Sequence, residues 1–248
     1  MLVDGCYQLT TNITFVYIFT LSNIQLNSNK VLITTEDGSH TLYMPDLNEN
    51  YHSTFGAIQE SNHVFIDKGF NGIIKSKKSI QIFEMGFGTG LNALLTLIEA
   101  EKQNVFVQYF AIEAYPLEDN ILKQLNYGNI IEEGKYEELF NKINNASWEK
   151  SDKLSPHFEI KKLNTSILEF VTANKFDLVY FDAFAPEVQP ELWTEDIFRK
   201  LFSIMNPGGI LVTYCCKGIV KRNMKTAGFN IEKLPGPPGK REMLRAQR

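Results

Sequence analysis

A mostly apolar segment followed by three alternating glycines constrains this chain more than any other feature. Residues 80–84 end at Glu84, and Gly86, Gly88 and Gly90 follow directly before a helical pattern. Glycine adopts backbone conformations that other residues avoid, and the first turn of a helix leaves backbone N–H groups free to bind a ligand. The segment therefore predicts a strand, a tight turn and a helix N-terminus that together can hold a nucleotide-like ligand.

The spacing of the glycines narrows the choice of ligand. A dinucleotide-binding turn needs a small residue at position 91, where this chain has Leu91. A bound NAD is therefore not expected. An ordinary strand-to-helix turn without a ligand is the alternative interpretation of the same pattern.

The chain has 248 residues, of which 44% are hydrophobic and 22% charged, and its net charge is -4. This composition allows one large domain, or one domain with an appendage, and excludes a protein that is basic overall. Cys6 stands alone and Cys215 and Cys216 are adjacent, which excludes a disulfide framework and fits a reducing cytoplasm. No metal is expected, because the four histidines lack metal-ligand spacing: His40, His52, His63 and His157.

Residues 13–21 form an apolar run that is too short to span a bilayer and lacks the preceding basic region of a signal peptide. No membrane association is expected from it. An extra strand, a leader segment and a start codon assigned too far upstream are the alternatives for this run.

From residue 79 onward, strand patterns alternate with helical patterns, which predicts an α/β fold with helices on both faces of a parallel sheet. Two further strands around a Pro/Gly loop predict an antiparallel pair at one edge. The expected fold is Rossmann-like, with a mostly parallel seven-stranded sheet and an antiparallel last strand. The strands are expected at 79–84, 105–113, 158–163, 176–182, 209–215, 229–234 and 241–246, and the helices at 91–101, 116–125, 130–143, 166–171 and 195–205.

Residues 1–78 are expected to form an N-terminal extension of a domain spanning 79–248. Two β-rich runs within 31–43 flank Asp37 and Gly38, which predicts a β-hairpin with a type I′ turn. The following segment, 51–65, is polar with aromatic residues among the polar ones. Its composition suits a helix beside a ligand cleft or a packed loop.

Sheets of this kind bind ligands at the carboxyl ends of their strands, so the residues there are candidates for the site. Glu113 ends the second strand, where its carboxylate can accept hydrogen bonds from both ribose hydroxyls of a nucleoside; a solvated loop residue is the alternative. Asn164 follows the third strand and is a candidate for binding an adenine amino group. Asp182 follows the fourth strand, which would deliver one carboxylate into the cleft; a cap on the next turn is the alternative.

Basic residues gather between positions 217 and 248, opposed only by Glu232 and Glu242. This cluster indicates either a solvated helix face and edge strand or a local phosphate-contacting surface beside the active site. The nine basic residues are Lys217, Lys221, Arg222, Lys225, Lys233, Lys240, Arg241, Arg245 and Arg248.

Several motifs together resemble one family, the MnmC-type tRNA wobble-uridine methyltransferase domain, which is a class I S-adenosylmethionine (SAM)-dependent methyltransferase. The acidic residue and alternating glycines of 84–90 resemble motif I of that class, and the antiparallel last strand resembles its sheet. The matching stretches are 58–66, 86–92, 181–186 with 190–194, 207–213 and 239–243, and the resemblance covers roughly residues 40–246.

The resemblance implies SAM-dependent N-methylation of 5-aminomethyl-(2-thio)uridine at the anticodon wobble position, which gives the 5-methylaminomethyl form. It implies SAM as cofactor, tRNA as partner, a cytoplasmic location, and Asp182 as the catalytic residue that orients the amine and takes its proton. The implied cofactor-binding residues are Glu84, Gly86, Phe87, Gly88, Thr89, Gly90, Asn92, Glu113, Asn164 and Asp182. The implied substrate-binding residues are Phe184, Pro186, Trp193, Lys240 and Arg241, although such aromatic residues can equally belong to the core or rim.

The chain departs from the family in two ways. Leu163 and Asn164 stand where the family often has Gly-Asp, which leaves the adenine contact open. The FAD-dependent oxidoreductase half is absent, which implies that the aminomethyl group comes from another enzyme. A SAM methyltransferase acting on a small molecule or protein, a binding scaffold without activity, and an aminopropyl transferase are the alternatives. The intact acidic and glycine positions argue against the scaffold, and the scarcity of acidic residues after Asp182 argues against a polyamine enzyme.

Overall fold

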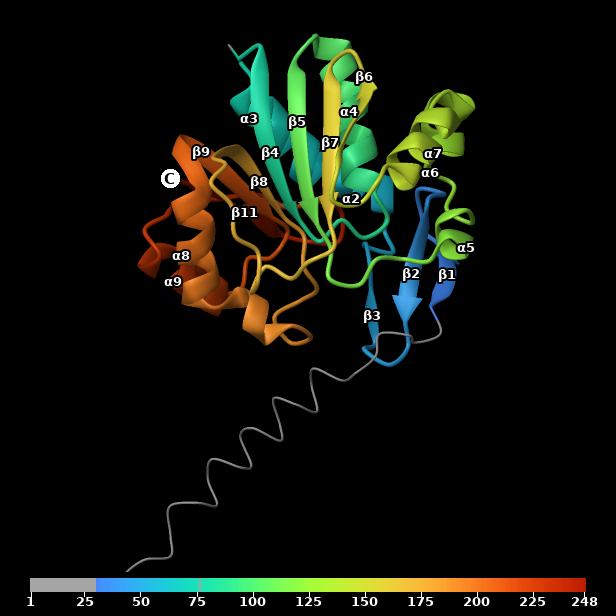
Figure 1. Cartoon of the computed structure of the whole chain (residues 1–248). Helices are drawn as coiled ribbons and strands as arrows, with labels where there is room; N and C mark the ends of the chain where they lie inside the picture. Colours follow the sequence, from blue (N-terminus) through green and yellow to red (C-terminus); the bar gives the residue numbers. More distant parts are fainter. Residues whose placement is uncertain (1–29, 76) are drawn as a thin grey trace, which may run out of the picture.

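The computed structural model describes residues 30–75 and 77–248 (Figure 1). Cys6 and the apolar run at 13–21 lie outside these residues. In the part of the chain described, no helix is long and apolar enough to cross a membrane.

A central eight-stranded sheet organises the molecule, in the order β10-β11-β9-β8-β4-β5-β7-β6. The five strands β9, β8, β4, β5 and β7 are parallel, whereas β11 is antiparallel to β9 and β6 is antiparallel to β7. The expected α/β fold with an antiparallel last strand is therefore confirmed. The strands are β4 (Ser79–Met85), β5 (Phe106–Ile112), β6 (Ser151–Ser155), β7 (Phe158–Leu163), β8 (Phe176–Phe181), β9 (Met205–Thr213), β10 (Asn230–Pro235) and β11 (Glu242–Gln247).

The expected count of seven strands is wrong, because β6 adds an eighth at the edge. Its sequence, SDKLS, is polar and none of its residues is buried, so no apolar alternation marks it. The strand is instead stabilised by its antiparallel backbone pairing with β7.

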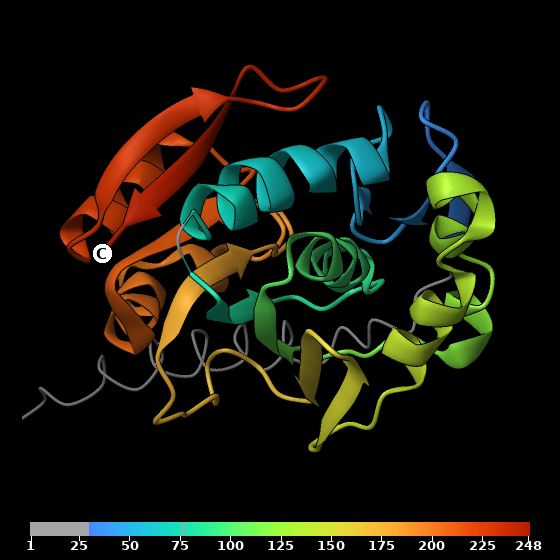
Figure 2. The ribbon, with the colours of Figure 1, turned by 90° about the horizontal axis from the view of Figure 1, so that it is seen from above.

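The two faces of the sheet carry separate apolar cores, as strand alternation requires. On one face, Ile82 of β4 packs with Leu94 of α4 (Leu91–Gln103). On the other face, Phe83 belongs to the cluster that includes Phe198 of α8 (Glu195–Ile204) and Val220 of α9 (Gly218–Thr226). The view from above separates the helical layers (Figure 2).

The N-terminal extension begins with a three-stranded antiparallel sheet, β1 (Val31–Thr34), β2 (His40–Met44) and β3 (Glu49–Asn50). The expected hairpin is confirmed, but its turn is not type I′. That turn needs positive φ at two central residues, whereas Gly38 has φ 83° and Asp37 lies outside the left-handed region. The Asp37 carboxylate instead accepts hydrogen bonds from Ser39 N at 3.0 Å and Thr35 Oγ1 at 2.8 Å.

A continuous helix follows, made of α2 (Ala57–Ser61), the π-helical η1 (Asn62–Phe70) and α3 (Asn71–Ile73). It packs on the same face of the sheet as α4, where the rings of Phe65 and Tyr180 lie 5.1 Å apart. The division of the chain at residue 78 into an extension and a domain stays a prediction.

Several expected helices are shorter than their patterns. Only α5 (Asp119–Leu122) forms within 116–125, and 166–171 forms turns. The pattern at 130–143 is divided between α6 (Tyr127–Ile130), η2 (Ile131–Gly134) and α7 (Glu137–Asn145). The cause is left-handed backbone at Glu132 and Glu133, with φ of 46° and 57°. Helix α9 was not predicted from its sequence.

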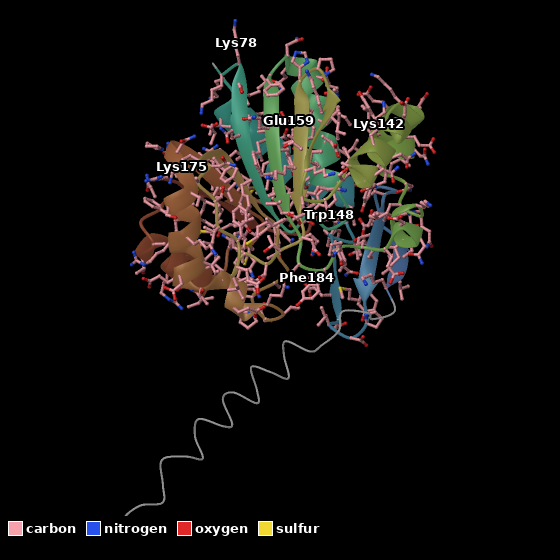
Figure 3. All side chains as sticks on the ribbon, in the orientation of Figure 1. Lys78, Lys142, Trp148, Glu159, Lys175 and Phe184 are labelled. Atoms are coloured by element: carbon pink, nitrogen blue, oxygen red, sulfur yellow. The ribbon has the colours of Figure 1, made fainter. Side chains whose placement is uncertain are left out.

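All five parallel strands run toward the same end of the sheet. Figure 3 shows Phe184 near that end and Lys78 at the opposite end. The carboxyl ends of β4, β5 and β8 therefore gather the glycine turn, Glu113 and Asp182 in one region.

Candidate active site

The glycine turn wraps tightly around the carboxyl end of β4. Gly86 has φ 92°, and a Cβ on it would lie 2.4 Å from the backbone oxygen of Asp182. Gly90 has φ 77° and caps the N-terminus of α4. The backbone nitrogens of Gly86 and Phe87 both donate to the carbonyl of Ile112 at 3.1 Å. The turn therefore presents bare backbone between the ends of β4, β5 and β8, as the sequence predicted.

A small cavity of ≈90 Å³ opens beside this turn. Glu113 lines it, and the two carboxylate oxygens accept hydrogen bonds from Gly88 N at 3.0 Å and Tyr115 N at 2.9 Å. These bonds fix the carboxylate at the tip of β5. The rest of the wall is formed by Tyr51, Met85, Gly86, Ile112, Ala114, Tyr115, Thr165, Ser166, Ile167, Ala183, Phe184, Gln189 and Leu192.

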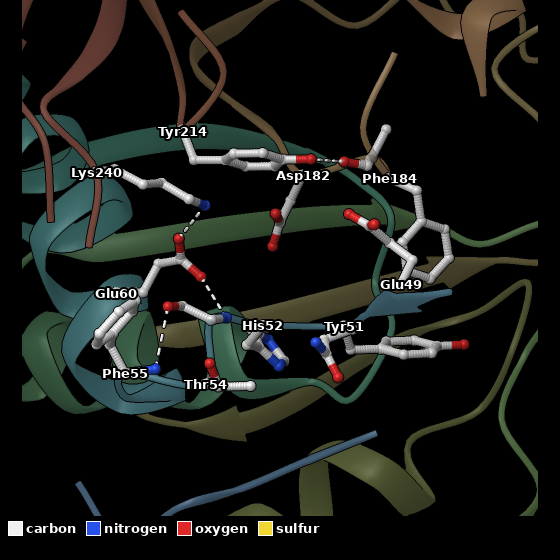
Figure 4. A pocket seen from close by; sticks show the side chains of 13 residues that line it. Glu49, Tyr51, His52, Thr54, Phe55, Glu60, Asp182, Phe184, Tyr214 and Lys240 are labelled. Carbon is white, nitrogen blue, oxygen red and sulfur yellow. Dashed lines mark hydrogen bonds and ion pairs between the residues drawn. The ribbon is translucent and has the colours of Figure 1, made fainter. Parts of the chain in front are cut away.

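A second, larger cavity of ≈260 Å³ adjoins the first (Figure 4). Its wall carries three carboxylates, Glu49 from β3, Glu60 from α2 and Asp182 from the end of β8, against one cation, Lys240. The remaining wall residues are Asn50, Tyr51, His52, Ser53, Thr54, Phe55, Ala183, Phe184 and Tyr214.

The rings of Tyr51 and Phe184 form the boundary between the two cavities. They meet edge to face with centroids 5.1 Å apart, and both line both cavities. A group transferred from one cavity to the other must cross at this boundary.

Asp182 lies in an environment that disfavours its charge. Burial raises the pKa of Asp182 to about 7, a hydrogen bond from Asn92 opposes that rise, and the nearby carboxylate of Glu60 adds to it. Glu84 at the end of β4 is fully buried, and burial raises its pKa well above the ordinary range. The Asn92 amide joins the two groups, donating to Glu84 Oε1 at 3.0 Å and Asp182 Oδ2 at 2.8 Å.

Lys240 is tied to the opposite wall of the larger cavity. Its ammonium forms an ion pair with Glu60 and lies 3.9 Å from the centroid of the Tyr214 ring. Glu60 also accepts a hydrogen bond from Ser53 N at 2.8 Å, and the Tyr214 hydroxyl donates to the Ala183 carbonyl at 2.8 Å. His52 is neutral near pH 7, because burial lowers its pKa to about 4.

Among the described residues, several predicted site residues do not line either of these two cavities. Phe87 is buried against Trp148, with ring centroids 6.0 Å apart. Asn164 is exposed and donates to the Glu113 carbonyl at 2.9 Å. Trp193 is 2% exposed and donates from Nε1 to the Phe184 carbonyl at 2.8 Å, so it supports the backbone of Phe184 from the core.

Pro186 and Arg241 line a third cavity of ≈560 Å³. This third cavity shares Lys240 and Tyr214 with the acidic cavity that contains Asp182. Its other wall residues are Ala185, Cys215, Cys216, Lys217, Lys233 and Glu242. Four cations face one carboxylate here, so this cavity, the basic groove, is the part of the basic cluster that adjoins the site.

Thr89 is buried in the glycine turn, with no hydrogen-bond partner for Oγ1 among the described residues.

Sequence reasoning missed Glu49, Glu60 and Tyr214 as wall residues. Tyr214 follows the end of β9, so the strand-end rule applied to one more strand would have found it. Glu60 gave no such signal, because its ion-pair partner Lys240 lies 180 positions away. Tyr51 and His52 belong to the polar segment expected beside a cleft.

In the part of the chain that the structure describes, no group of three or more His, Cys, Asp or Glu side chains could hold a metal ion.

Comparisons with known proteins fit this geometry. Residues 135–248 match a family model described as S-adenosyl-L-methionine-dependent methyltransferase. Two relatives named tRNA 5-methylaminomethyl-2-thiouridine biosynthesis bifunctional protein MnmC are each 31% identical, one from Leptospira interrogans over 78% of this chain and one from Cupriavidus necator over 81%. The chain spans about a third of the length of these relatives, 32% in each case.

A solved structure has the same fold. The crystal structure of MNMC2 from Aquifex aeolicus matches with a TM-score of 0.74 at 24% identity, covering 98% of this chain and 77% of that chain. The fold and the family match together define a class I SAM-dependent methyltransferase. Within that class, the expected resemblance to the MnmC-type methyltransferase domain is confirmed over 78% and 81% of this chain by these two relatives.

The residues at the smaller cavity fit SAM as the cofactor of this family. A Cβ at Gly86 would collide with the Asp182 carbonyl, so a residue without a side chain is required at this point of the turn. Glu113 would accept hydrogen bonds from ribose hydroxyls. Glu84 and Asn92, two further residues expected at the cofactor, are buried and line neither of the two cavities.

Proposed function

We propose that this chain methylates the primary amine of 5-aminomethyl-(2-thio)uridine at the tRNA wobble position, giving 5-methylaminomethyl-(2-thio)uridine. The relatives' names support the substrate. The observation that carries the proposal is the larger cavity, where three carboxylates face one lysine beside the cofactor edge. A tRNA substrate would place the protein in the cytoplasm.

The charge of the larger cavity suits an alkylamine. Glu49, Glu60 and Asp182 outnumber Lys240, so an ammonium group entering the cavity is attracted. Glu60 is already paired with Lys240. Of the other two carboxylates, Asp182 directly precedes Ala183, which lines both cavities. We therefore assign the amine to Asp182.

The amine must lose a proton before it can react. An alkylamine has a pKa of about 10.4, so roughly one molecule in a thousand is neutral near pH 7, and deprotonation costs about 4 kcal/mol. Asp182 in its ionised form accepts that proton and passes it to solvent, while its hydrogen bond holds the nitrogen lone pair toward the boundary. Bound SAM would supply the electrophilic methyl group.

Placement of the nitrogen is the larger contribution. Holding two reacting groups in line supplies up to roughly 7–11 kcal/mol. The Tyr51–Phe184 boundary defines the direction of approach, and Trp193 fixes Phe184 through its carbonyl. The rings of Phe184 and Tyr214 offer faces on which an unstacked wobble base can lie. The basic groove next to Tyr214 suits the adjoining phosphates.

Transfer of labelled methyl from SAM to tRNA tests the proposal. A tRNA carrying 5-aminomethyluridine should accept one methyl group per molecule, and the same tRNA with unmodified uridine should accept none. Asp182→Asn should keep SAM binding but lose roughly 10²–10⁴-fold in single-turnover rate, as is typical for a general base. Methylation of a small molecule or protein, with the aminomethyl tRNA left unlabelled, would overturn the assignment and favour the alternative substrate.

A further inference from the structure

Asn92 connects the cofactor side of the site to its substrate side. It is the second residue of α4 and is 3% exposed, so its side chain is held inside the fold. Glu84 and Asp182 reach it from the ends of the neighbouring parallel strands β4 and β8. The amide thus lies at the junction of the glycine-turn helix and two strand ends.

The amide nitrogen of Asn92 faces both carboxyl groups. The nitrogen Nδ2 lies 3.0 Å from Glu84 Oε1 and 2.8 Å from Asp182 Oδ2. An amide nitrogen carries two hydrogens, and each of these contacts uses one. An amide oxygen can only accept hydrogen bonds, so the nitrogen is the end that suits an ionised Asp182.

The second oxygen of Asp182 is left for the substrate. Oδ1 takes no hydrogen bond from the residues that the structure describes, and Asp182 lines the larger cavity. We propose that Asn92 is a positioning residue for Asp182, which locks Oδ2 and so directs Oδ1 toward the amine to be methylated. The inference rests on the proposed amine methylation.

Asn92 also affects the proton affinity of Asp182, because a hydrogen bond to a carboxylate favours its ionised form. Removing the amide is expected to raise the pKa of Asp182 further. The other charged and titratable groups around Asp182 come from several neighbouring elements and are Glu49, Tyr51, His52, Glu60, Glu84, Tyr109, Tyr214 and Lys240.

The first test needs no substrate. The titration of Asp182 is followed by carbon-13 NMR in the parental chain and in Asn92→Ala, with Asp182→Asn to assign the signal. The pKa of Asp182 should rise by about one unit in Asn92→Ala. Thr96→Ala is the matched control, because Thr96 is a buried polar residue one turn further along α4 that donates to the Asn92 carbonyl at 2.7 Å. It should leave the Asp182 titration unchanged.

The second test uses single-turnover methylation of aminomethyl tRNA. Asn92→Ala should lower the rate by about 10–100-fold, since a misplaced group has an effect of this size. It should also shift the acid limb of the pH–rate profile to higher pH, because the pKa of Asp182 rises. In the Asp182→Asn background the same substitution should have almost no further effect. The Thr96→Ala variant should react at the parental rate.

Two results would overturn the inference. One is an Asp182 pKa that is the same in Asn92→Ala and the parental chain. The other is an equal rate loss from Asn92→Ala with and without Asp182. A parental chain that methylates no aminomethyl tRNA would refute the proposed function instead, while the NMR titration would still decide the Asn92–Asp182 link. If Asn92→Ala fails to fold, Asn92→Ser carries the same tests with a smaller loss of buried polarity.

Discussion

The rings of Tyr51 and Phe184 meet edge to face at 5.1 Å and divide the site into a small cavity and a larger acidic one. Tyr51 directly follows β3, and Phe184 lies in the loop after β8. Residues that are far apart in the sequence therefore form the boundary between the two cavities. The residues on either side of this pair can be tested separately.

The glycine turn gives the first test, because its glycines are not equivalent. A Cβ at Gly86 would lie 2.4 Å from a backbone oxygen, whereas a Cβ at Gly88 would lie 3.4 Å from the Tyr51 ring. Gly86→Ala should therefore destabilise the chain and abolish SAM binding, while Gly88→Ala should show only the smaller cost of its left-handed φ of 51°. Thermal melts and calorimetric SAM titrations measure both. Equal effects of the two substitutions would contradict this account of the turn.

Glu113 gives a test of the cofactor site. Glu113→Ala should weaken SAM binding, because the ribose hydroxyls lose their acceptor. It should also lower the melting temperature of the ligand-free protein, since Gly88 N and Tyr115 N lose their hydrogen-bond acceptor. Glu113→Gln keeps one acceptor oxygen, so its SAM affinity and melting temperature should lie between those of the parental chain and Glu113→Ala. SAM affinity that is unchanged in both variants would remove Glu113 from the cofactor site.

Asp182 predicts a dependence of stability on pH. Its pKa is about 7 in the folded chain and about 3.9 in an unfolded one, so between these values the folded state holds a proton that the unfolded state has released. Stability is therefore lost as pH rises from about 4 to 7, and the loss is complete above about 7. Asp182→Asn should melt higher than the parental chain at pH 8, with a gap that narrows toward pH 4. The exposed Asp46→Asn should show no such gap.

Arg241 and Lys240 should behave differently although they are adjacent. Arg241 is exposed in the basic groove, so Arg241→Ala should weaken tRNA binding and reduce the slope of its salt dependence by about one. Lys240→Ala leaves the buried Glu60 without its cation, so it should also lower the melting temperature. Lys78→Ala, at the opposite end of the sheet, is the control for a lost surface charge (Figure 3). Parental tRNA affinity in Arg241→Ala would exclude the groove from tRNA binding.

The parts of the fold that the sequence predicts best are those with a strong local cause. The glycine turn needs positive φ, and the apolar strands β4 and β8 need burial on both faces, so the residue pattern alone is enough to locate them. The strand ends then place Glu113 and Asp182 correctly in space. Helix α7 was misplaced because two glutamates, Glu132 and Glu133, adopt a backbone that their side chains do not favour.

The larger cavity could not be predicted in the same way. Its wall joins β3, α2, β8, β9 and the loop before β11, and only folding brings these together. The Glu60–Lys240 pair is the clearest case, because neither residue carries a local signal for the other. Trp193 takes the core position that the sequence left open as an alternative. Its indole is near a strand end in sequence, yet its hydrogen bond to Phe184 keeps it in the core.

The position of the transferred methyl group distinguishes methylation of the wobble amine from methylation at any other atom of the tRNA. The purified chain is incubated with trideuteromethyl-SAM and a tRNA that carries 5-aminomethyluridine, and the digested nucleosides are analysed by fragmentation mass spectrometry. Amine methylation would leave one labelled methyl group on the exocyclic amine nitrogen of the wobble nucleoside, at a rate that falls steeply in Asp182→Asn. A label on the ribose, on a ring atom or on any other nucleoside would contradict it.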